Sequence, residues 1–386
     1  MVRILLQVHS LLFLSPMNRS HYRRCGQGIP LALLAVFFLA LCTSCRSPGA
    51  ELALSDRLYA LWLEQAPQSS DWERALPREI IVKGGRVHKL NPLPDIDEDT
   101  VHVTTASCHH GSTPPAPLSV DVRAFYTDSD LYLRFSWPDP TRDEVIRQWQ
   151  FDGKEWLASP ALEDGLGILW DNDNRFHQFT CSYACHIDGF GVAGANFHAS
   201  NKMKLPRDEG IELDLWNWKA GRTARFGFAD DRTLAFKGME GDVPGEIFLE
   251  NSRVRSEGQG SIAIFGVGDT PLYDQEGRSI GKEFRPAGSV APGYISARPV
   301  GSRADVGAVT EYRNGRWTVT LHRALRTADR RDVVFTPGKT SGVAFGLSIM
   351  DDTIKEHYAS ITSEYLVLLP KNVPPLPSPL PQVERE

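Results

Sequence analysis

The chain has 386 residues, of which 41% are hydrophobic and 23% are charged, and its formal net charge is −6. This length and composition support a hydrophobic core in one large domain or two small ones, and they exclude a chain that is disordered over most of its length. The acidic balance also excludes nucleic acid as the expected partner, because nucleic-acid binding calls for a basic face.

The first 44 residues have the pattern of an export signal that starts at Met1 or Met17. Three arginines at 19–24 precede an apolar run over 29–42, which is shorter than the roughly 20 residues that a membrane-spanning helix needs. An uncleaved membrane anchor is the alternative. Residues 1–44 hold four arginines and no acidic residue, so their removal changes the net charge from −6 to about −10.

The end of this signal resembles the lipobox of bacterial lipoproteins, in which small residues precede a cysteine that becomes acylated. Thr43 and Ser44 precede Cys45, whereas Cys42 stands where lipoproteins usually have Leu. We therefore expect Cys45 to carry lipid, which places the mature protein in the periplasm or cell envelope, anchored to a membrane. Ordinary signal cleavage, which leaves a protein without lipid, is the alternative.

Residues 45–70 are expected to form a short linker followed by one amphipathic helix. The linker has a turn-forming composition. Over residues 56–65, Leu58, Leu61 and Trp62 recur near one face at helical spacing. This pattern predicts a helix that docks its apolar face on the body of the protein.

Strand signals dominate from residue 71 to 369 and predict an antiparallel β-sandwich. Residues 119–126 and 131–137 alternate apolar and polar side chains on either side of a short turn, which predicts a hairpin with one buried face. Asn314-Gly315 favours a second tight hairpin turn. The remaining expectations are strands at 166–170, 261–265, 316–321 and 343–349, a long surface loop over 271–301, and an extended proline-rich tail over 370–386.

The most informative motif is Cys181-Ser-Tyr-Ala-Cys185-His186. In a covalent haem c site each thiol bonds to a haem vinyl group and the adjacent imidazole faces the iron, but the usual spacing, Cys-x-x-Cys-His, is one residue shorter. A disulfide in an oxidising compartment, or a zinc site with a fourth ligand from elsewhere, fits the same residues. The motif alone leaves haem, disulfide and zinc open.

Four sequence pieces occur in a particular order. They are LYLRFSWPDPT at 131–141, EDGLGILW at 163–170, the motif at 181–186, and Met203 followed by DLWNWKAGR at 214–222 and GFADD at 227–231. In this order they resemble the haem-binding domain of the ethylbenzene dehydrogenase-related family, which includes cytochrome c-552 and DMSO reductase-like haem-binding domains. The resemblance extends from about residue 72 to 369.

This resemblance implies a β-sandwich similar in shape to carbohydrate-binding modules, with haem held among loops at one edge. It also implies electron transfer outside the cytoplasmic membrane. In the best-known relatives the haem is b-type and lies between a methionine and a lysine, whereas other relatives carry a Cys-x-x-x-Cys-His cluster. The family brings no substrate chemistry, so we expect an electron-transfer protein and not an enzyme.

His186 is the first expected iron ligand, because imidazole binds both oxidation states of haem iron. Met203 is the second, since a thioether favours reduced iron and matches the methionine of the family. His198 is the alternative to Met203, and Met350 and Lys355 rank below both. A histidine held by a loop and a methionine that fills a gap in the core are the structural alternatives.

Trp216 and Trp218 share one face of an expected strand, and Lys219 points to the other face. The tryptophans either wall the haem pocket or pack the core. Lys219 matches the Trp-x-Trp-Lys piece of the family and, like Arg222, is a candidate to meet a haem propionate. Asp230-Asp231 is most simply read as part of a turn.

The expected function is single-electron transfer by an exported cytochrome whose cofactor is haem iron, c-type in preference to b-type. Its partner would be a redox protein, and an acidic surface suits a basic one. A haem subunit of a larger molybdenum oxidoreductase is one alternative. A haem-free, carbohydrate- or ligand-binding lipoprotein with a Cys181–Cys185 disulfide is another. Cys108-His109-His110 is a candidate for a distal ligand or a second metal site, with a solvated loop as the simpler alternative.

Overall fold

A computed structural model describes one of the two units into which the chain divides. The units are Met1–Pro48 and Gly49–Glu386, and every described residue belongs to the second. The described residues are 56–83, 116–159, 161–171, 210–235, 238–245, 247–252, 270–281, 285–351, 358–360 and 364–371. The predicted export signal, Cys45 and the tail beyond Lys371 lie outside them.

Nearly every described element is a β-strand. The strands are β1 Arg57–Trp62, β2 Arg78–Lys83, β3 Leu118–Tyr126, β4 Asp130–Pro138, β5 Trp149–Phe151, β6 Trp156–Ala158, β7 Gly165–Asp171, β8 Glu212–Lys219, β9 Asp230–Ala235, β10 Gly238–Gly241, β11 Phe248–Glu250, β12 Val290–Ala291, β13 Tyr294–Ser296, β14 Gly307–Tyr312, β15 Arg316–Ala324, β16 Val343–Met350, β17 Tyr358–Ser360 and β18 Glu364–Leu368. Among the same residues, the helices are the short 3-10 turns η1 Ser69–Glu73, η2 Ala224–Phe226 and η3 Ser302–Ala304. No helix in this part of the chain has the length and apolarity to cross a membrane.

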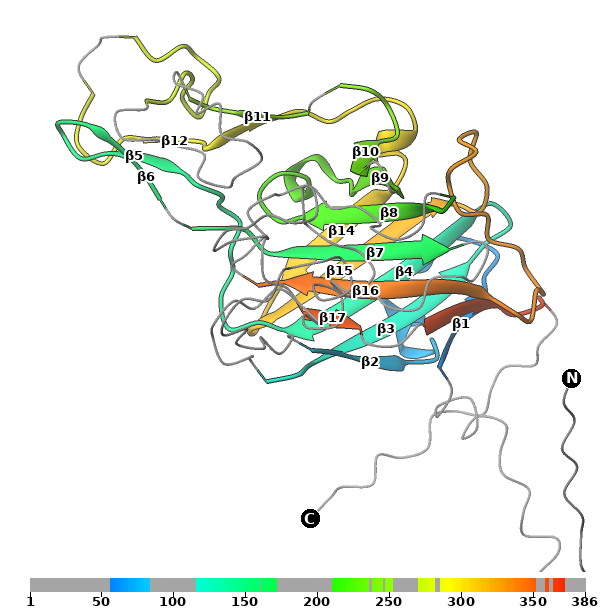
Figure 1. The fold of residues 1–386 in the computed structure, drawn as a ribbon. Helices are drawn as coiled ribbons and strands as arrows, with labels where there is room; N and C mark the ends of the chain where they lie inside the picture. Colours follow the sequence, from blue (N-terminus) through cyan, green and yellow to red (C-terminus); the bar gives the residue numbers. More distant parts are fainter. Residues whose placement is uncertain are drawn as a thin grey trace, which may run out of the picture. The chain divides into compact units, whose positions relative to one another are not determined.

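Thirteen strands form one sheet that folds over into two layers (Figure 1). One layer has the order β10-β9-β8-β7-β16, the other has the order β2-β3-β4-β15-β14, and β17 links them between β16 and β2. The layers meet through aromatic side chains, because the ring centroid of Trp218 in β8 lies 5.2 Å from that of Trp317 in β15 and 6.3 Å from that of Trp137 in β4. Apart from the parallel pairs of β1, the strands pair antiparallel. The predicted antiparallel β-sandwich is confirmed.

Both predicted hairpins are present. β3 and β4 are joined by a turn in which the Thr127 amide donates to the Asp130 carbonyl at 2.8 Å. β14 and β15 are joined through Asn314 and Gly315, whose φ angles are 52° and 68°. Two consecutive residues with positive φ define the type I′ turn that an Asn-Gly pair favours.

The predicted helix over 56–65 is wrong, because Arg57–Trp62 forms strand β1. This strand pairs in parallel with both β18 and β3. Leu58 and Ala60 are buried and alternate with partly exposed neighbours, as on a strand. Hydrogen-bond partners on both edges of β1 outweigh a local helical pattern that extends over only a few residues.

Two small sheets, β12-β5-β6 and β11-β13, lie outside the main sheet. β12 and β13 fall within 271–301, so the prediction of a surface loop there is only partly correct. Trp149 packs with Ile280 and Ala291 to form the apolar core of this region. Strands of two or three residues are too short to show a period of two in the sequence, which is why the pattern missed them.

Asn251 holds these small sheets together, and we predict that Asn251→Ala lowers the free energy of unfolding by about 2–4 kcal/mol. Its buried side-chain amide donates to the carbonyls of Tyr273 and Pro292, each at 2.7 Å, and accepts from the amides of Leu272 at 2.9 Å and Tyr273 at 2.8 Å. Truncation leaves these backbone groups without partners. Urea unfolding measures the loss, and Gln150→Ala at an exposed position of β5 is the control that should change little. Equal stability of both variants would contradict the prediction.

Candidate functional site

The tryptophans and the lysine of strand β8 lie on opposite faces of the sheet. Trp216 and Trp218 point into the sandwich and are fully buried in the main core. Of the two roles predicted for them, the geometry supports core packing. Lys219 follows Trp218 and therefore projects from the outer face of this layer, as the alternation of a strand requires.

The Lys219 ammonium is buried without a hydrogen-bond partner among the described residues. Its side chain is 10% exposed, its Nζ lies 3.7 Å from Asp230 Oδ2, and the Phe248 ring centroid is 5.2 Å away. Burial lowers the pKa of Lys219 from 10.5 to about 7, against the attraction of Asp230. A buried amine whose pKa lies this low has a substantial neutral fraction near neutral pH, and a neutral amine has a lone pair for a metal.

Asp230 forms ion pairs with the two guanidinium groups near this amine. Its Oδ1 accepts from Arg303 Nε at 2.8 Å, and its Oδ2 lies 3.3 Å from Arg232 NH1. Burial alone would raise the pKa of Asp230, but Lys219 and the two guanidinium groups outweigh burial and lower it. The prediction that Asp230-Asp231 belongs to a turn is wrong, since both residues are buried in β9. Cations from other elements make this burial tolerable.

Glu163 holds Arg222, which follows Lys219 by three residues in the chain. The Glu163 carboxylate accepts from the Arg222 side chain and from the backbone amides of Gly221 at 2.8 Å and Arg222 at 2.9 Å. The Arg222 guanidinium also lies over the rings of Phe248 at 5.0 Å and Tyr294 at 5.3 Å. Arg222 therefore forms an ion pair with Glu163. A haem propionate, its predicted partner, would compete with Glu163 for the guanidinium group.

An apolar cluster covers the outer face of β7, β8 and β9. Its buried members are Leu169, Ile211, Leu213, Leu215 and Leu234, with Met239 packed against them. Asp171 ends β7, and the described chain resumes at Gly210, just before β8. The connection 172–209, which carries most of the predicted haem ligands, therefore begins and ends beside this cluster.

A cavity of ≈ 700 Å³ adjoins the apolar cluster at Met239. Arg232 and Arg303, which both pair with Asp230, line it together with Arg331 and Met239. The outer face of this layer thus combines an apolar surface, guanidinium groups and one buried amine without a hydrogen-bond partner.

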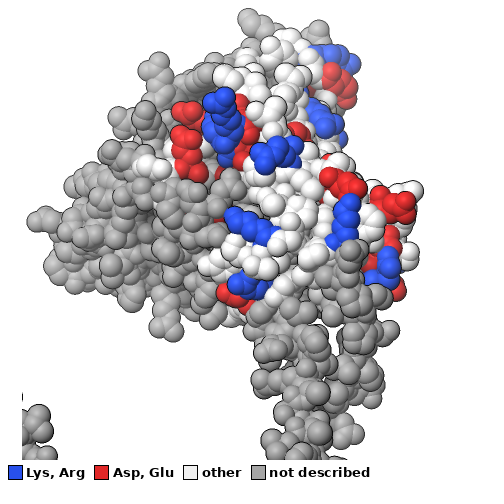
Figure 2. Space-filling view, turned by 90° about the vertical axis from the view of Figure 1, so that its right-hand side faces the viewer, with Lys and Arg blue, Asp and Glu red and all other residues white. Residues whose placement is uncertain are grey.

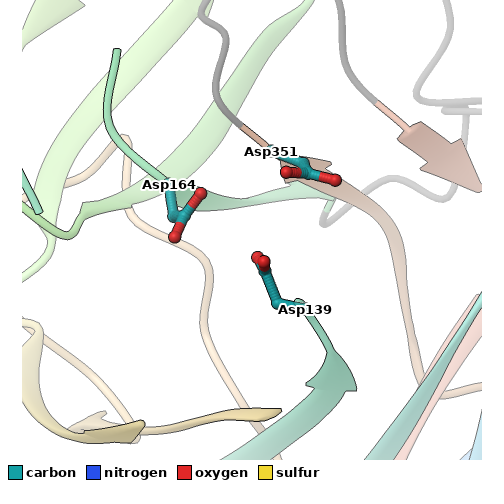
Figure 3. Close-up of side chains that lie close together, drawn as sticks. All are labelled: Asp139, Asp164 and Asp351. Carbon is teal, nitrogen blue, oxygen red and sulfur yellow. The ribbon is translucent and has the colours of Figure 1, made fainter. Parts of the chain in front are cut away.

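Three carboxylates converge at another position, where Asp139 follows β4, Asp164 precedes β7 and Asp351 follows β16 (Figure 3). Asp164 Oδ2 accepts from Trp317 Nε1 at 2.8 Å and from the Asp143 amide at 2.9 Å. Burial, together with the charges of Asp139 and Asp143, raises the pKa of Asp351. The sequence gives no signal for this cluster because its members lie far apart in the chain, and the hydrogen bonds show that it orders the strand ends.

Most of the predicted site residues lie outside the part of the chain that the structure describes. They are Cys181, Cys185, His186, His198, Met203, Lys355 and the Cys108-His109-His110 triplet. Met350 ends β16 and is partly buried against Gly165 of β7. Of the predicted cofactor-binding residues, the structure therefore places Trp216, Trp218 and Lys219, and only Lys219 reaches the outer face.

The fold and this outer face define a mainly β, antiparallel sandwich with a buried amine on one layer. Residues 72–358 match the family model described as ethylbenzene dehydrogenase. Because the match covers most of the chain, this protein belongs to the ethylbenzene dehydrogenase family. The family relates it to a subunit of molybdenum enzymes.

Two solved structures are similar to this chain at a low level. A putative carbohydrate-binding protein from Bacteroides uniformis is 8% identical, with 80% of this chain and 88% of that chain covered and a TM-score of 0.29. A carbohydrate-binding module of family 9 from Caldicellulosiruptor kristjanssonii, solved in complex with glucose, is 9% identical, with 83% and 100% covered and a TM-score of 0.27. A search of curated proteins finds no match. TM-scores this low support no functional argument.

Proposed function

We propose that this protein binds haem on the outer face of β7, β8 and β9 and transfers single electrons. The buried Lys219 amine, which lacks a hydrogen-bond partner among the described residues, carries this proposal. A buried polar atom without a hydrogen-bond partner needs an explanation, and a bound ligand or metal ion would provide one. The resemblance to relatives that hold haem between a methionine and a lysine supports Lys219 as that ligand.

The surroundings of Lys219 fit such a cofactor. Haem is a flat apolar ring with carboxylates at one edge, and this face has both an apolar cluster and a cavity lined by arginines. When bound, haem supplies an iron that gains and loses one electron. The chain would exclude water with its leucines, orient the carboxylate edge with Arg232 and Arg303, and hold the iron with Lys219.

The ligands in the connection 172–209 remain proposals. His186 or Met203 would supply a further ligand to the iron besides Lys219, and thioether bonds to Cys181 and Cys185 would make the haem c-type. A haem held by Lys219 and Met203 alone would be b-type and would leave the cysteines structural. The connection joins β7 and β8 beside the apolar cluster, at the end of β8 that is away from Lys219. Either arrangement would require it to extend along the outer face as far as the lysine.

The proposed setting is the periplasm or cell envelope, with Cys45 as the lipid anchor and a redox protein as partner. Figure 2 shows lysines and arginines interspersed with acidic residues over the described part of one face. Attraction to a basic partner would therefore arise from the net charge of the mature chain rather than from a single-sign patch on that face. Family membership supports a second candidate, a haem subunit of a molybdenum-containing oxidoreductase.

The first test is a pyridine haemochrome spectrum of the full chain, exported in a host with a haem c maturation system, before and after acid-acetone extraction. A c-type band that survives extraction supports thioether bonds. An extractable b-type band supports non-covalent haem and a structural role for the cysteines. A colourless protein would overturn the proposal.

We predict that Lys219→Leu abolishes the low-spin haem spectrum while the protein still folds. Leucine fills a similar volume without a ligand atom, and Asp230 keeps its two arginine partners. Absorption and electron paramagnetic resonance spectra measure the change, and circular dichroism reports the fold. Lys154→Leu at an exposed position is the matched control. An unchanged spectrum in Lys219→Leu would exclude the lysine as a ligand and leave His186 and Met203 as the pair.

A further inference from the structure

A second group of buried charges surrounds Arg323 inside the sandwich. Arg323 is 1% exposed, and its guanidinium lies 4.8 Å from the ring centroid of Trp216. Its NH1 is 2.7 Å from Asp214 Oδ2, 3.4 Å from Asp231 Oδ2 and 3.7 Å from Asp332 Oδ2. One guanidinium thus faces three buried carboxylates.

Acidic residues still outnumber basic ones when the next neighbours are included. The charged groups come from every element packed round the cluster: Asp214 of β8, Asp231 of β9, Asp242 after β10, Asp305 after η3, Arg323 of β15, and Asp329, Arg331 and Asp332 of the segment after β15. Arg331 NH2 lies 2.7 Å from Asp329 Oδ2 and 3.8 Å from Asp242 Oδ1. Arg331 is therefore paired mainly with Asp329. Arg323 is left as the cation for the other carboxylates.

Several carboxylate oxygens in this cluster have no hydrogen-bond donor among the described residues. They are Oδ1 of Asp214, Asp231 and Asp332. Water reaches them little, because these residues are only 3%, 0% and 2% exposed. An ionised carboxylate left in this state is costly. One carboxylate oxygen from each of Asp214, Asp231 and Asp332 lies within 4.8 Å of the other two. Ionised carboxylates this close repel one another, and a proton on one of them removes the repulsion.

We propose that the Arg323 cluster retains protons between its carboxylates at neutral pH, so that acid stabilises the folded protein and a rising pH weakens it. The geometry carries this inference, because the acidic groups exceed the guanidinium groups and their free oxygens are buried. The cluster connects β8 and β9, which form the proposed haem face, with β15 of the opposite layer. A change in its proton content would therefore act on the packing of the two layers.

The pKa values agree with this inference. Burial and the charge of Asp214 raise the pKa of Asp231 well above its ordinary value. Burial raises the pKa of Asp242 to about 7 and that of Asp305 to about 6. An acid whose pKa is higher in the folded than in the unfolded state binds more protons when folded. Its stabilising contribution is complete below the unfolded pKa of about 4 and is lost as the pH rises through about 6 to 7.

The test is urea unfolding of the full chain between pH 5 and 8.5 at constant ionic strength, with either calcium or EDTA present. We expect the folding constant of the wild type to fall by up to about tenfold per pH unit for each retained proton while the pH lies below the folded pKa of that group, and to level off above it. Asp242→Asn and Asp305→Asn should each reduce this dependence by up to one proton, because an amide resembles the protonated acid and does not titrate. Glu240→Gln, at an exposed neighbour of Asp242, should keep the wild-type dependence.

Three results would overturn the proposal. They are a wild-type folding constant that does not depend on pH, a pH dependence that both Asn variants leave unchanged, and a calcium-induced stabilisation that removes the dependence. The last result would show that a cation, and not protons, neutralises the cluster. If one Asn variant fails to fold, the other variant and the wild-type profile still decide the question.

Discussion

Arg323→Met is expected to lower the free energy of unfolding by about 3–5 kcal/mol at pH 7.5. The Arg323 guanidinium donates to Asp214 Oδ2 at 2.7 Å and to the Val333 carbonyl. Methionine fills part of its volume but supplies no charge, so buried carboxylates lose their cation. Removal of one partner from a buried ion pair costs more than the pair contributes, because the other charge stays buried.

Urea unfolding measures this loss, and Arg326→Met is the control because Arg326 lies just after the end of β15 and is exposed. The control should change the free energy of unfolding by less than about 0.5 kcal/mol. At pH 5 the loss in Arg323→Met should be smaller, since protonated carboxyls need no cation. A loss below about 1 kcal/mol at pH 7.5 would mean that hydrophobic packing supports this end of the core without the ion pairs.

Trp218→Ala is expected to cost about 3–5 kcal/mol through the cavity that it opens between the layers. The indole is fully buried and makes edge contacts with Trp137 and Trp317 of the opposite layer. These contacts connect β8 to β4 and β15, so truncation removes packing on which the proposed haem face depends. Unfolding by heat and by urea measures the effect.

Trp156→Ala is the matched control for this substitution. Trp156 is partly buried in the small sheet β12-β5-β6, where its ring contacts Phe151 at 5.4 Å, and it lies outside the main core. We expect a smaller loss of stability and an unchanged haem spectrum. Equal losses in both variants would mean that the small sheet and the sandwich unfold as one cooperative unit.

Local patterns in the sequence determined the class of fold and two hairpins. Alternation over residues 119–137 predicted β3 and β4, and Asn314-Gly315 predicted the turn between β14 and β15. The same alternation correctly placed Lys219 on the opposite face of β8 from Trp218. The order of four sequence pieces also indicated the family that the match over residues 72–358 establishes. These features are readable because the period of a strand and the shape of a tight turn depend on neighbouring residues.

Only the tertiary structure decided the state of the charged residues and of β1. Asp230 and Asp231 look like turn residues, yet they are buried in β9 because Arg303 and Arg323 reach them from 73 and 92 residues further along the chain. The Lys219 amine is likewise buried by residues that are distant in the sequence, such as Asp230 and Phe248. Residues Arg57–Trp62 became a strand because β3 and β18 supply two open edges. Ion pairing and strand pairing join distant parts of the chain, so periodicity within a segment cannot predict them.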